Sequence, residues 1–243
     1  MRKLCDFLAI TKLFAGLNHK VYGDYCEQTN IHIYWKGEFI AREGDVSSGV
    51  GIVLEGQVAK QKYSSDGDYS TLDLLEAGDT FGEDFIFCTD NRFNFSLEAV
   101  SAVKVVYVRR EDLFEMINRS PQMLSNLLKL LSNHIKEQNK RIYTLSQRTL
   151  RQKISAYLLE LLDQQLIAEN RTLEEATAIV STQAVELPAS KEVVSHLLAM
   201  PRPSFSRELI SMEKDGLIKV SGRVIWLMDL AGLENGILDD FTS

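Results

Sequence analysis

Four polar side chains at the start of one short helical segment could read the edges of DNA bases. Within residues 202–212, Phe205, Leu209 and Met212 fall on one side at helical spacing. The other side carries hydrogen-bond donors, namely Arg202, Ser204, Ser206 and Arg207. An arginine guanidinium can pair with both acceptors of a guanine, and a serine hydroxyl can bond to several bases. The segment therefore predicts a helix that reads bases in a major groove.

The residues around this segment predict how it is held. Residues 190–198 form a first short amphipathic helix, and Ala199-Met200-Pro201 separate it from the second, as in a helix-turn-helix. Residues 217–220 and 223–227 are β-rich runs joined by a two-residue turn at Ser221-Gly222. Together these elements predict a winged helix, and the alternative is an ordinary helical hairpin beside a β-hairpin. Three basic residues at the first helix and on the wing are expected to contact DNA phosphates: Lys191, Lys219 and Arg223.

The net charge of the chain is −7, which at first argues against a nucleic-acid partner. The charges are unevenly spread, however. Residues 119–146 hold five Lys and Arg against one acidic residue, and residues 189–226 hold six against four. Attraction to phosphate requires only a local basic face, and a dimer would double that face. We therefore expect DNA binding of modest affinity.

A long helix is predicted from Ser120-Pro121, which is a helix start signal, to Leu145. A heptad seam runs along it without a break: Leu124, Leu128, Leu131, Ile135, Gln138, Ile142 and Leu145. A second stripe, formed by Met123, Leu127 and Leu130, could pack on a neighbouring domain while the seam meets a partner helix. The seam therefore predicts a parallel homodimer, in which Gln138 helps to fix the register. The alternative is a helix buried entirely within one chain.

The region before this helix is rich in short β-runs punctuated by glycine. Runs at roughly 8–12-residue spacing are typical of an all-β sandwich or barrel such as a jelly roll. Examples are Ile31–Trp35, Gly49–Leu54, Gln57–Tyr63, Tyr69–Leu75 and Ala102–Val108.

The predicted division of the chain is a β-roll sensor domain at 1–118, a dimerisation helix at 119–146 and a winged helix-turn-helix domain at 147–243. In the last part, Thr149 and Gln152 resemble a capping box that opens a helix. Residues 165–186 are expected to be a loop with a short strand near Ile179-Val180.

The three cysteines, Cys5, Cys26 and Cys88, are odd in number and widely spaced, so we expect free thiols in a reducing cytoplasm. Residues 1–17 are expected to form an amphipathic helix and not a signal peptide, because Asp6 and Lys12 interrupt the apolar run. No apolar segment is long enough to span a membrane. The expected location is the cytoplasm.

The order β-roll, long helix, winged helix-turn-helix resembles the cAMP receptor protein/FNR (Crp/Fnr) family of bacterial transcription regulators. In the β-rich part the resemblance is carried by Gly37–Asp45, Gly56 and Ala77–Glu83. In the C-terminal part it is carried by Leu187–Lys191, Arg202, Ser206-Arg207 and Gly216–Ile218. It covers nearly the whole chain and implies an α+β fold with a cyclic-nucleotide-binding-like β-roll. It also implies a homodimer on a palindromic double-stranded operator, with RNA polymerase as a partner of any activator.

In cAMP-binding members of this family, a Gly-Glu pair holds the ribose, and Gly82 and Glu83 match that pair. The phosphate clamp of those members is an Arg followed by Ser or Thr. Here Arg92 is followed by Phe93, which has no hydroxyl. If the alignment is instead counted back from Ala99, Phe93 itself falls at the position of the Arg. Without that clamp the phosphate loses charge-assisted hydrogen bonds, so cAMP is not the expected effector. Two polar residues fall near the positions where the family's long helix reaches the nucleotide, Gln138 and Asn139.

Glu83 is as compatible with a structural role in its loop as with ligand contact. The cysteines are too few and too dispersed for the iron–sulfur cluster of the oxygen-sensing branch. The four histidines, His19, His32, His134 and His196, are more consistent with structural roles than with haem ligation. The effector and any cofactor therefore stay open, and no metal site is expected.

In the resemblance, Arg202 and Arg207 match the two base-reading arginines of the family, and Ser206 matches a base-contacting serine of the FNR branch. Pro203 replaces the family's Glu, which removes one acceptor and is expected to push Arg202 out of helical dihedral angles.

Two other classes of function share parts of this pattern. A metal-dependent cupin enzyme needs clustered histidines in its β-roll, and only His32 lies in a β-run, so we expect no enzyme. A ligand-binding module that acts through protein contacts is the remaining alternative, although outward arginines favour DNA.

Overall fold

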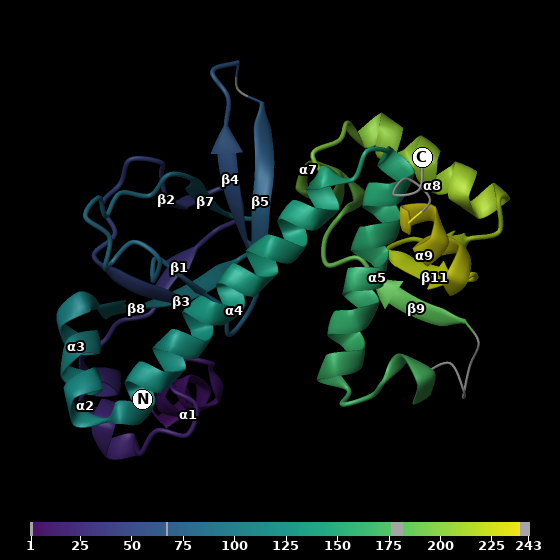
Figure 1. Ribbon diagram of the computed structural model, residues 1–243. Helices are drawn as coiled ribbons and strands as arrows, with labels where there is room; N and C mark the ends of the chain where they lie inside the picture. The colour runs from purple at the N-terminus through teal and green to yellow at the C-terminus, as the bar shows by residue number, and fades with distance from the viewer. Residues whose placement is uncertain (1, 67, 176–181, 239–243) are drawn as a thin grey trace. The chain divides into compact units, whose positions relative to one another are not determined.

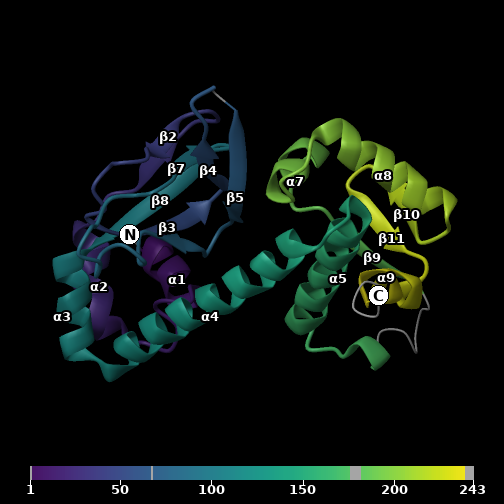
Figure 2. The ribbon, with the colours of Figure 1, turned by 45° about the horizontal axis from the view of Figure 1, so that its top comes forward.

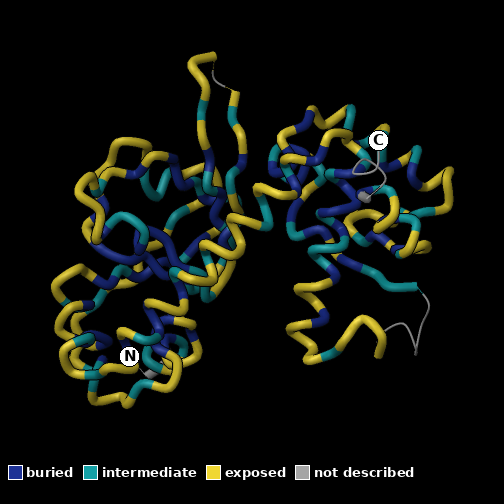
Figure 3. The backbone as a smooth tube through the Cα atoms, in the orientation of Figure 1, coloured by how far each residue is buried: buried dark blue, intermediate teal, exposed yellow. Residues whose placement is uncertain are grey.

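The computed structural model describes residues 2–66, 68–175 and 182–238. The chain separates into two compact units, residues 1–137 and 138–243, and the boundary falls within helix α4 (Pro121–Ser146). Each unit has its own buried core, which Figure 3 shows as dark segments inside each unit. The predicted three-part division stays a prediction.

The first unit contains two four-stranded antiparallel sheets, which confirms the predicted β-roll class (Figure 1). One sheet has the order β1 (His32–Tyr34), β8 (Val103–Arg109), β3 (Gly49–Glu55), β6 (Thr80–Phe81). The other has the order β2 (Phe39–Ala41), β7 (Ser96–Ala99), β4 (Val58–Tyr63), β5 (Tyr69–Leu75). Their shared core is apolar and β-branched or aromatic, as in Val53, Val58, Phe95, Leu97 and Val105. The sequence did not predict β2, β6 and β7, because runs of two to four residues carry too little alternation to stand out from loops.

Three further helices and the first part of α4 build a second core in this unit. They are α1 (Arg2–Ile10), α2 (His19–Gln28) and α3 (Arg110–Arg119). Met123, Leu127 and Leu130 of α4 are all buried in that core. The buried amide of Asn126 donates to the carbonyl oxygens of Leu13 at 3.0 Å and Ala15 at 2.8 Å. Packing and these hydrogen bonds fix which side of α4 faces inward.

The expectation of free thiols is wrong for Cys5 and Cys26, which form a disulfide. The chain folds back between α1 and α2, and this brings the two Cα atoms to 5.8 Å although they are 21 positions apart in the sequence. Cys88 is free and exposed, and its Sγ donates to the carbonyl oxygen of Asp84 at 3.0 Å.

The second unit is a small three-stranded sheet surrounded by helices (Figure 2). Its strands follow the order β10 (Ile218–Ser221), β11 (Val224–Leu227), β9 (Gln183–Glu186), and β10 and β11 form the predicted wing hairpin. Its helices after α4 include α5 (Leu150–Ala168), α7 (Lys191–Leu197), α8 (Arg202–Lys214) and α9 (Leu230–Leu238). Their common core includes Ile154, Leu158, Val194, Phe205 and Ile225.

Helix α5 begins with the predicted capping box. The Thr149 hydroxyl accepts from the Gln152 backbone N–H at 3.2 Å, and the Gln152 side chain accepts from the Thr149 backbone N–H at 3.1 Å. The helix continues to Ala168, beyond the point at which a loop was expected. The strand predicted near Ile179-Val180 lies outside the described residues, and the observed strand is β9.

Among the described helices, none combines the length and apolar character that a bilayer span requires.

Candidate DNA-binding surface and effector site

Helix α7 is capped at both ends, and a four-residue turn joins it to α8. The Ser190 hydroxyl accepts from the Val193 backbone N–H at 3.3 Å, which caps the start of α7. At the end of α7, the Arg141 guanidinium donates to the Leu197 carbonyl oxygen at 2.7 Å. Ala199 then takes a φ of +50°, which reverses the chain toward α8. This is the predicted helix-turn-helix.

Helix α8 divides into a buried side and an accessible side. Phe205, Leu209 and Met212 are buried against the core. On the other side Arg202 and Arg207 are exposed, and Ser204 and Ser206 are half-buried. The four proposed base-reading residues therefore remain within reach of a ligand.

The Arg207 guanidinium lies along the first turn of α8. Its Nε donates to the Pro203 carbonyl oxygen at 3.3 Å, and its Nη2 lies 3.4 Å from the Ser204 Oγ. Two of the predicted base readers therefore touch. The Arg202 guanidinium has no partner among the described residues.

The prediction that Pro203 excludes Arg202 from the helix is wrong, because α8 begins at Arg202 with Pro203 in its second position. The first backbone N–H groups of a helix have no acceptor within it, so proline removes no hydrogen bond there.

The three residues predicted to contact DNA phosphates differ in whether they already form an ion pair within the protein. Lys219 is exposed on β10 and Lys191 opens α7, and neither makes an ion pair with a described residue. Arg223 is also exposed, but its guanidinium pairs with the Glu186 carboxylate on β9. Its charge is therefore partly neutralised.

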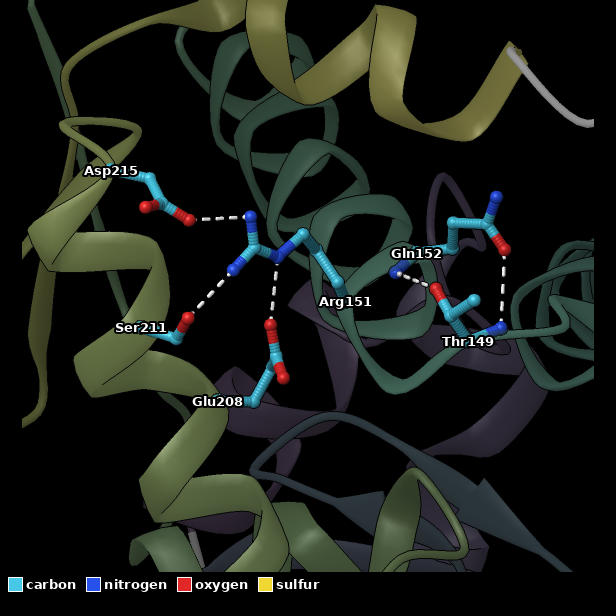
Figure 4. Close-up of polar contacts among 6 residues, drawn as sticks. All are labelled: Thr149, Arg151, Gln152, Glu208, Ser211 and Asp215. Atoms are coloured by element: carbon cyan, nitrogen blue, oxygen red, sulfur yellow. Dashed lines mark hydrogen bonds and ion pairs between the residues drawn. The ribbon is translucent and has the colours of Figure 1, made fainter.

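Arg151, which the sequence reasoning missed, joins α5 to α8 (Figure 4). Its Nε donates to Glu208 Oε1 at 2.7 Å, its Nη1 to Asp215 Oδ2 at 2.6 Å, and its Nη2 to Ser211 Oγ at 2.8 Å. A signal was available in the sequence, because a cation in the first turn of a helix is disfavoured by the helix dipole unless acceptors face it.

Glu83 lies in the first unit, next to a position that only glycine can occupy. Gly82 has a φ of +88°, and a Cβ there would lie 2.7 Å from the Gly49 carbonyl oxygen. The Glu83 side chain is buried, and its Oε1 accepts from His134 Nδ1 on α4 at 2.9 Å. Its other oxygen, Oε2, is buried without a hydrogen-bond partner among the described residues. The pKa of His134 is raised above its ordinary value of 6.5, chiefly by this hydrogen bond, while burial lowers it.

A second charged pair lies close to Glu83. Lys60 Nζ is 3.8 Å from Asp84 Oδ2 and 3.9 Å from the centre of the Phe95 ring. Burial raises the pKa of Asp84, and the Lys60 ammonium partly offsets that rise. The structure thus places Lys60 and His134 on the two neighbouring carboxylates of the loop, which the sequence did not predict.

Arg92 is not directed toward Glu83. It is exposed, and its Nη1 donates to the Gly44 carbonyl oxygen at 2.8 Å. Phe93 is instead buried, with its ring 5.2 Å from that of Phe85 and 5.6 Å from that of Phe95. A cavity of about 410 Å³ is lined in part by Phe93 and by Phe81, Tyr107, Ser47 and Asp45. Gln138 and Asn139 are exposed on α4 in the second unit, and their part in an effector site stays a prediction.

The comparisons with known proteins agree for both halves of the chain. Residues 31–120 match the cyclic nucleotide-binding domain family, and residues 152–235 match the Crp-like helix-turn-helix domain family. The transcriptional regulator SdrP of Thermus thermophilus is 30% identical over 182 residues, which are 75% of this chain and 80% of SdrP. The chain belongs to the Crp/Fnr family of transcription regulators. This Crp/Fnr protein is therefore a DNA-binding transcription regulator.

This Crp/Fnr regulator has further relatives. The nitrogen fixation regulation protein FixK of Bradyrhizobium diazoefficiens is 25% identical over 198 residues, which are 82% of this chain and 78% of FixK. Two solved structures share its fold. FixK2 from Bradyrhizobium japonicum has a TM-score of 0.65 at 22% identity, covering 85% of this chain and 96% of that one. A CooA variant from Carboxydothermus hydrogenoformans has a TM-score of 0.71 at 20% identity, covering 93% and 99%.

Helix α4 of this Crp/Fnr regulator leaves most of the predicted heptad seam uncovered. Leu124, Leu128, Ile135 and Ile142 are exposed by 42, 55, 61 and 65% in the single chain. Gln138 is exposed as well, Leu145 is half-buried, and Leu131 packs partly on the core of the first unit. Leu124 and Leu128 line a groove of about 560 Å³ along the helix. The stripe formed by Met123, Leu127 and Leu130 is thus buried while most of the heptad seam is exposed, as the sequence predicts.

Proposed function

We propose that this protein is a homodimeric regulator that reads a palindromic operator and responds through its β-roll to an effector other than cAMP. The observation that carries the proposal is the accessible side of α8, which presents Arg202, Ser204, Ser206 and Arg207 on a helix held by its opposite side. In this proposal the protein acts in the cytoplasm, contacts RNA polymerase where it activates, and catalyses no reaction. Its parts are the sensor domain, dimerisation helix and DNA-binding domain that the sequence predicts.

The dimer is supported by the uncovered stripe of α4. Four large apolar side chains of the heptad seam are uncovered, and burying them against an identical helix is favourable by about 25 cal/mol per Å². In such a dimer a two-fold axis would relate the two copies of α8, and each copy would enter one of two successive major grooves.

An effector other than cAMP is supported by the residues around Glu83. A cyclic phosphate needs a cationic clamp, but the clamp position holds the buried Phe93 and the neighbouring Arg92 bonds to Gly44. One oxygen of the Glu83 carboxylate, the group that would accept a ribose hydroxyl, already accepts from His134, and only Oε2 is without a partner among the described residues.

This function is tested by letting the wild-type protein select the duplexes that it binds from a pool of randomised sequences. We expect a palindrome with half-sites about one helical turn, roughly 34 Å, apart. Titration of the selected duplex with the protein should give the same affinity, within about twofold, with and without cAMP, because the protein has no cationic clamp for the cyclic phosphate. Enrichment of no sequence would instead favour a module that acts through protein contacts, and a cAMP-dependent affinity lost in Glu83→Ala would contradict the effector proposal.

The Glu83–His134 pair predicts a stability that depends on pH. The unfolded pKa of His134 is about 6.5 and the folded pKa is raised. The contribution of the pair is therefore fully present below pH 6.5 and is lost as the pH rises through the folded pKa. We expect His134→Gln to destabilise the first unit by about 1 kcal/mol at pH 6 and by less at pH 8.5. Urea unfolding in a Trp226→Phe background measures this, because Trp35 then reports on the first unit alone.

The groups that face His134 are Glu83, Asp84, Lys60 and Glu137. His32→Gln is the matched control, since His32 contacts the Tyr107 ring and no described carboxylate. A destabilisation by His134→Gln that is equal at both pH values would contradict the role of the charged pair.

A further inference from the structure

We propose that Arg151 is the positioning residue of the recognition helix: it fixes the rotation of α8 about its own axis and so directs Arg207 and the neighbouring serines toward the bases. This inference rests on the proposed reading of DNA by α8. It concerns a residue outside that helix, in the first turn of α5.

The three acceptors of Arg151 lie on one face of α8. Glu208, Ser211 and Asp215 are spaced by three and four residues, so they line up along the helix. Each takes a different nitrogen of the guanidinium, at 2.6 to 2.8 Å. The planar guanidinium presents its donors in a rigid arrangement, so three acceptors on it define an orientation as well as a distance (Figure 4).

Arg151 and Asp215 each occupy a position that their own helix disfavours. Arg151 is the second residue of α5, where the helix dipole is positive, and Asp215 is the C-cap of α8, where it is negative. The stability of each helix by itself therefore does not explain why Arg151 and Asp215 stand at these positions. The 2.6 Å ion pair between the two side chains does explain it.

The apolar side of α8 alone defines its rotation only loosely. Phe205, Leu209 and Met212 hold α8 on the core, but apolar contact is not directional, whereas hydrogen bonds weaken steeply when misaligned. Arg207 precedes Glu208 directly, and the two hydrogen bonds of its guanidinium stay within the first turn of α8. The direction of Arg207 therefore follows the rotation of the helix, and Arg151 holds that rotation at the adjacent residue.

The test compares Arg151→Ala with Arg171→Ala. Arg171 is the matched control, because its side chain is 35% exposed, as is that of Arg151, and it pairs with Glu169 away from α8. For each variant, affinity is measured for the duplex selected by the wild type, for its single-base variants, and for a shuffled duplex of the same length, at two salt concentrations. Arg151→Ala should reduce the ratio of selected to shuffled affinity by at least about fivefold. Arg151→Lys should recover part of the ratio, since an ammonium can still reach some acceptors, and Arg171→Ala should leave it unchanged.

Three results would overturn the proposal. Equal weakening on both duplexes with a shallower salt dependence would make Arg151 a phosphate contact. A lower melting temperature with an unchanged affinity ratio would make its role structural only. Where Arg151→Ala does not fold, Glu208→Ala and Asp215→Ala each remove one acceptor, and an unchanged ratio in both would also refute the idea. Wild-type protein that does not discriminate between the duplexes would refute the proposed function instead.

Discussion

Replacing Leu128 and Ile135 with lysine is expected to convert a dimer of two chains into single chains. The two side chains are 55 and 61% exposed in one chain, so the change removes little from the core of the first unit. In a parallel pair of α4 helices it would place four ammonium groups in the seam, and burying unpaired charges costs several kcal/mol each. Light scattering during size-exclusion chromatography measures this change as a fall in molar mass from that of two chains to that of one chain.

Leu131, although predicted in the same seam, is not used in this test, because it packs partly on the core of the first unit. The matched control is Ile10→Lys with Ile33→Lys, which adds the same charge at positions 79 and 57% exposed and outside the heptad seam. The control should remain a dimer. A double α4 variant that keeps the mass of two chains would show that this stripe is not the interface.

The elements that the sequence predicted well are those with a repeating pattern. The heptad and the second stripe of α4, the apolar side of α8 and the Ser221-Gly222 hairpin all depend on neighbours within a few residues, and the structure forms each of them. Short strands such as β6 contain too few residues to show a period, so they were missed.

The contacts that the sequence could not predict join residues far apart in the chain. Arg151 meets Glu208 and Asp215 across 57 and 64 residues, and the Cys5–Cys26 disulfide spans 21. The sequence favours a structural role for His134, but no residue near it in the chain identifies Glu83 as its partner. Such pairs follow from how whole elements pack, which periodicity alone does not define. The unfavourable helix positions of Arg151 and Asp215 were the local signs that a distant partner exists.

The roles of Arg207 and Lys219 should separate in a binding titration against a library of single-base operator variants. The Arg207 guanidinium is exposed at the start of α8 and can pair with both acceptors of a guanine. Arg207→Ala should therefore weaken binding by about 1–3 kcal/mol per half-site and relax the preference at one base pair in each half-site. Lys219 is exposed on the wing strand β10, where phosphate contact is expected, so Lys219→Ala should weaken binding to all sequences alike and flatten the salt dependence.

Arg223→Ala provides an internal comparison for the wing. Because Arg223 already pairs with Glu186, its loss should change the salt dependence less than the loss of Lys219, which has no described ion-pair partner. The assignment fails if Arg207→Ala lowers the affinity for every sequence equally while Lys219→Ala alters the preferred base. In that outcome the wing would read the sequence, and the start of α8 would anchor the protein to the phosphate backbone.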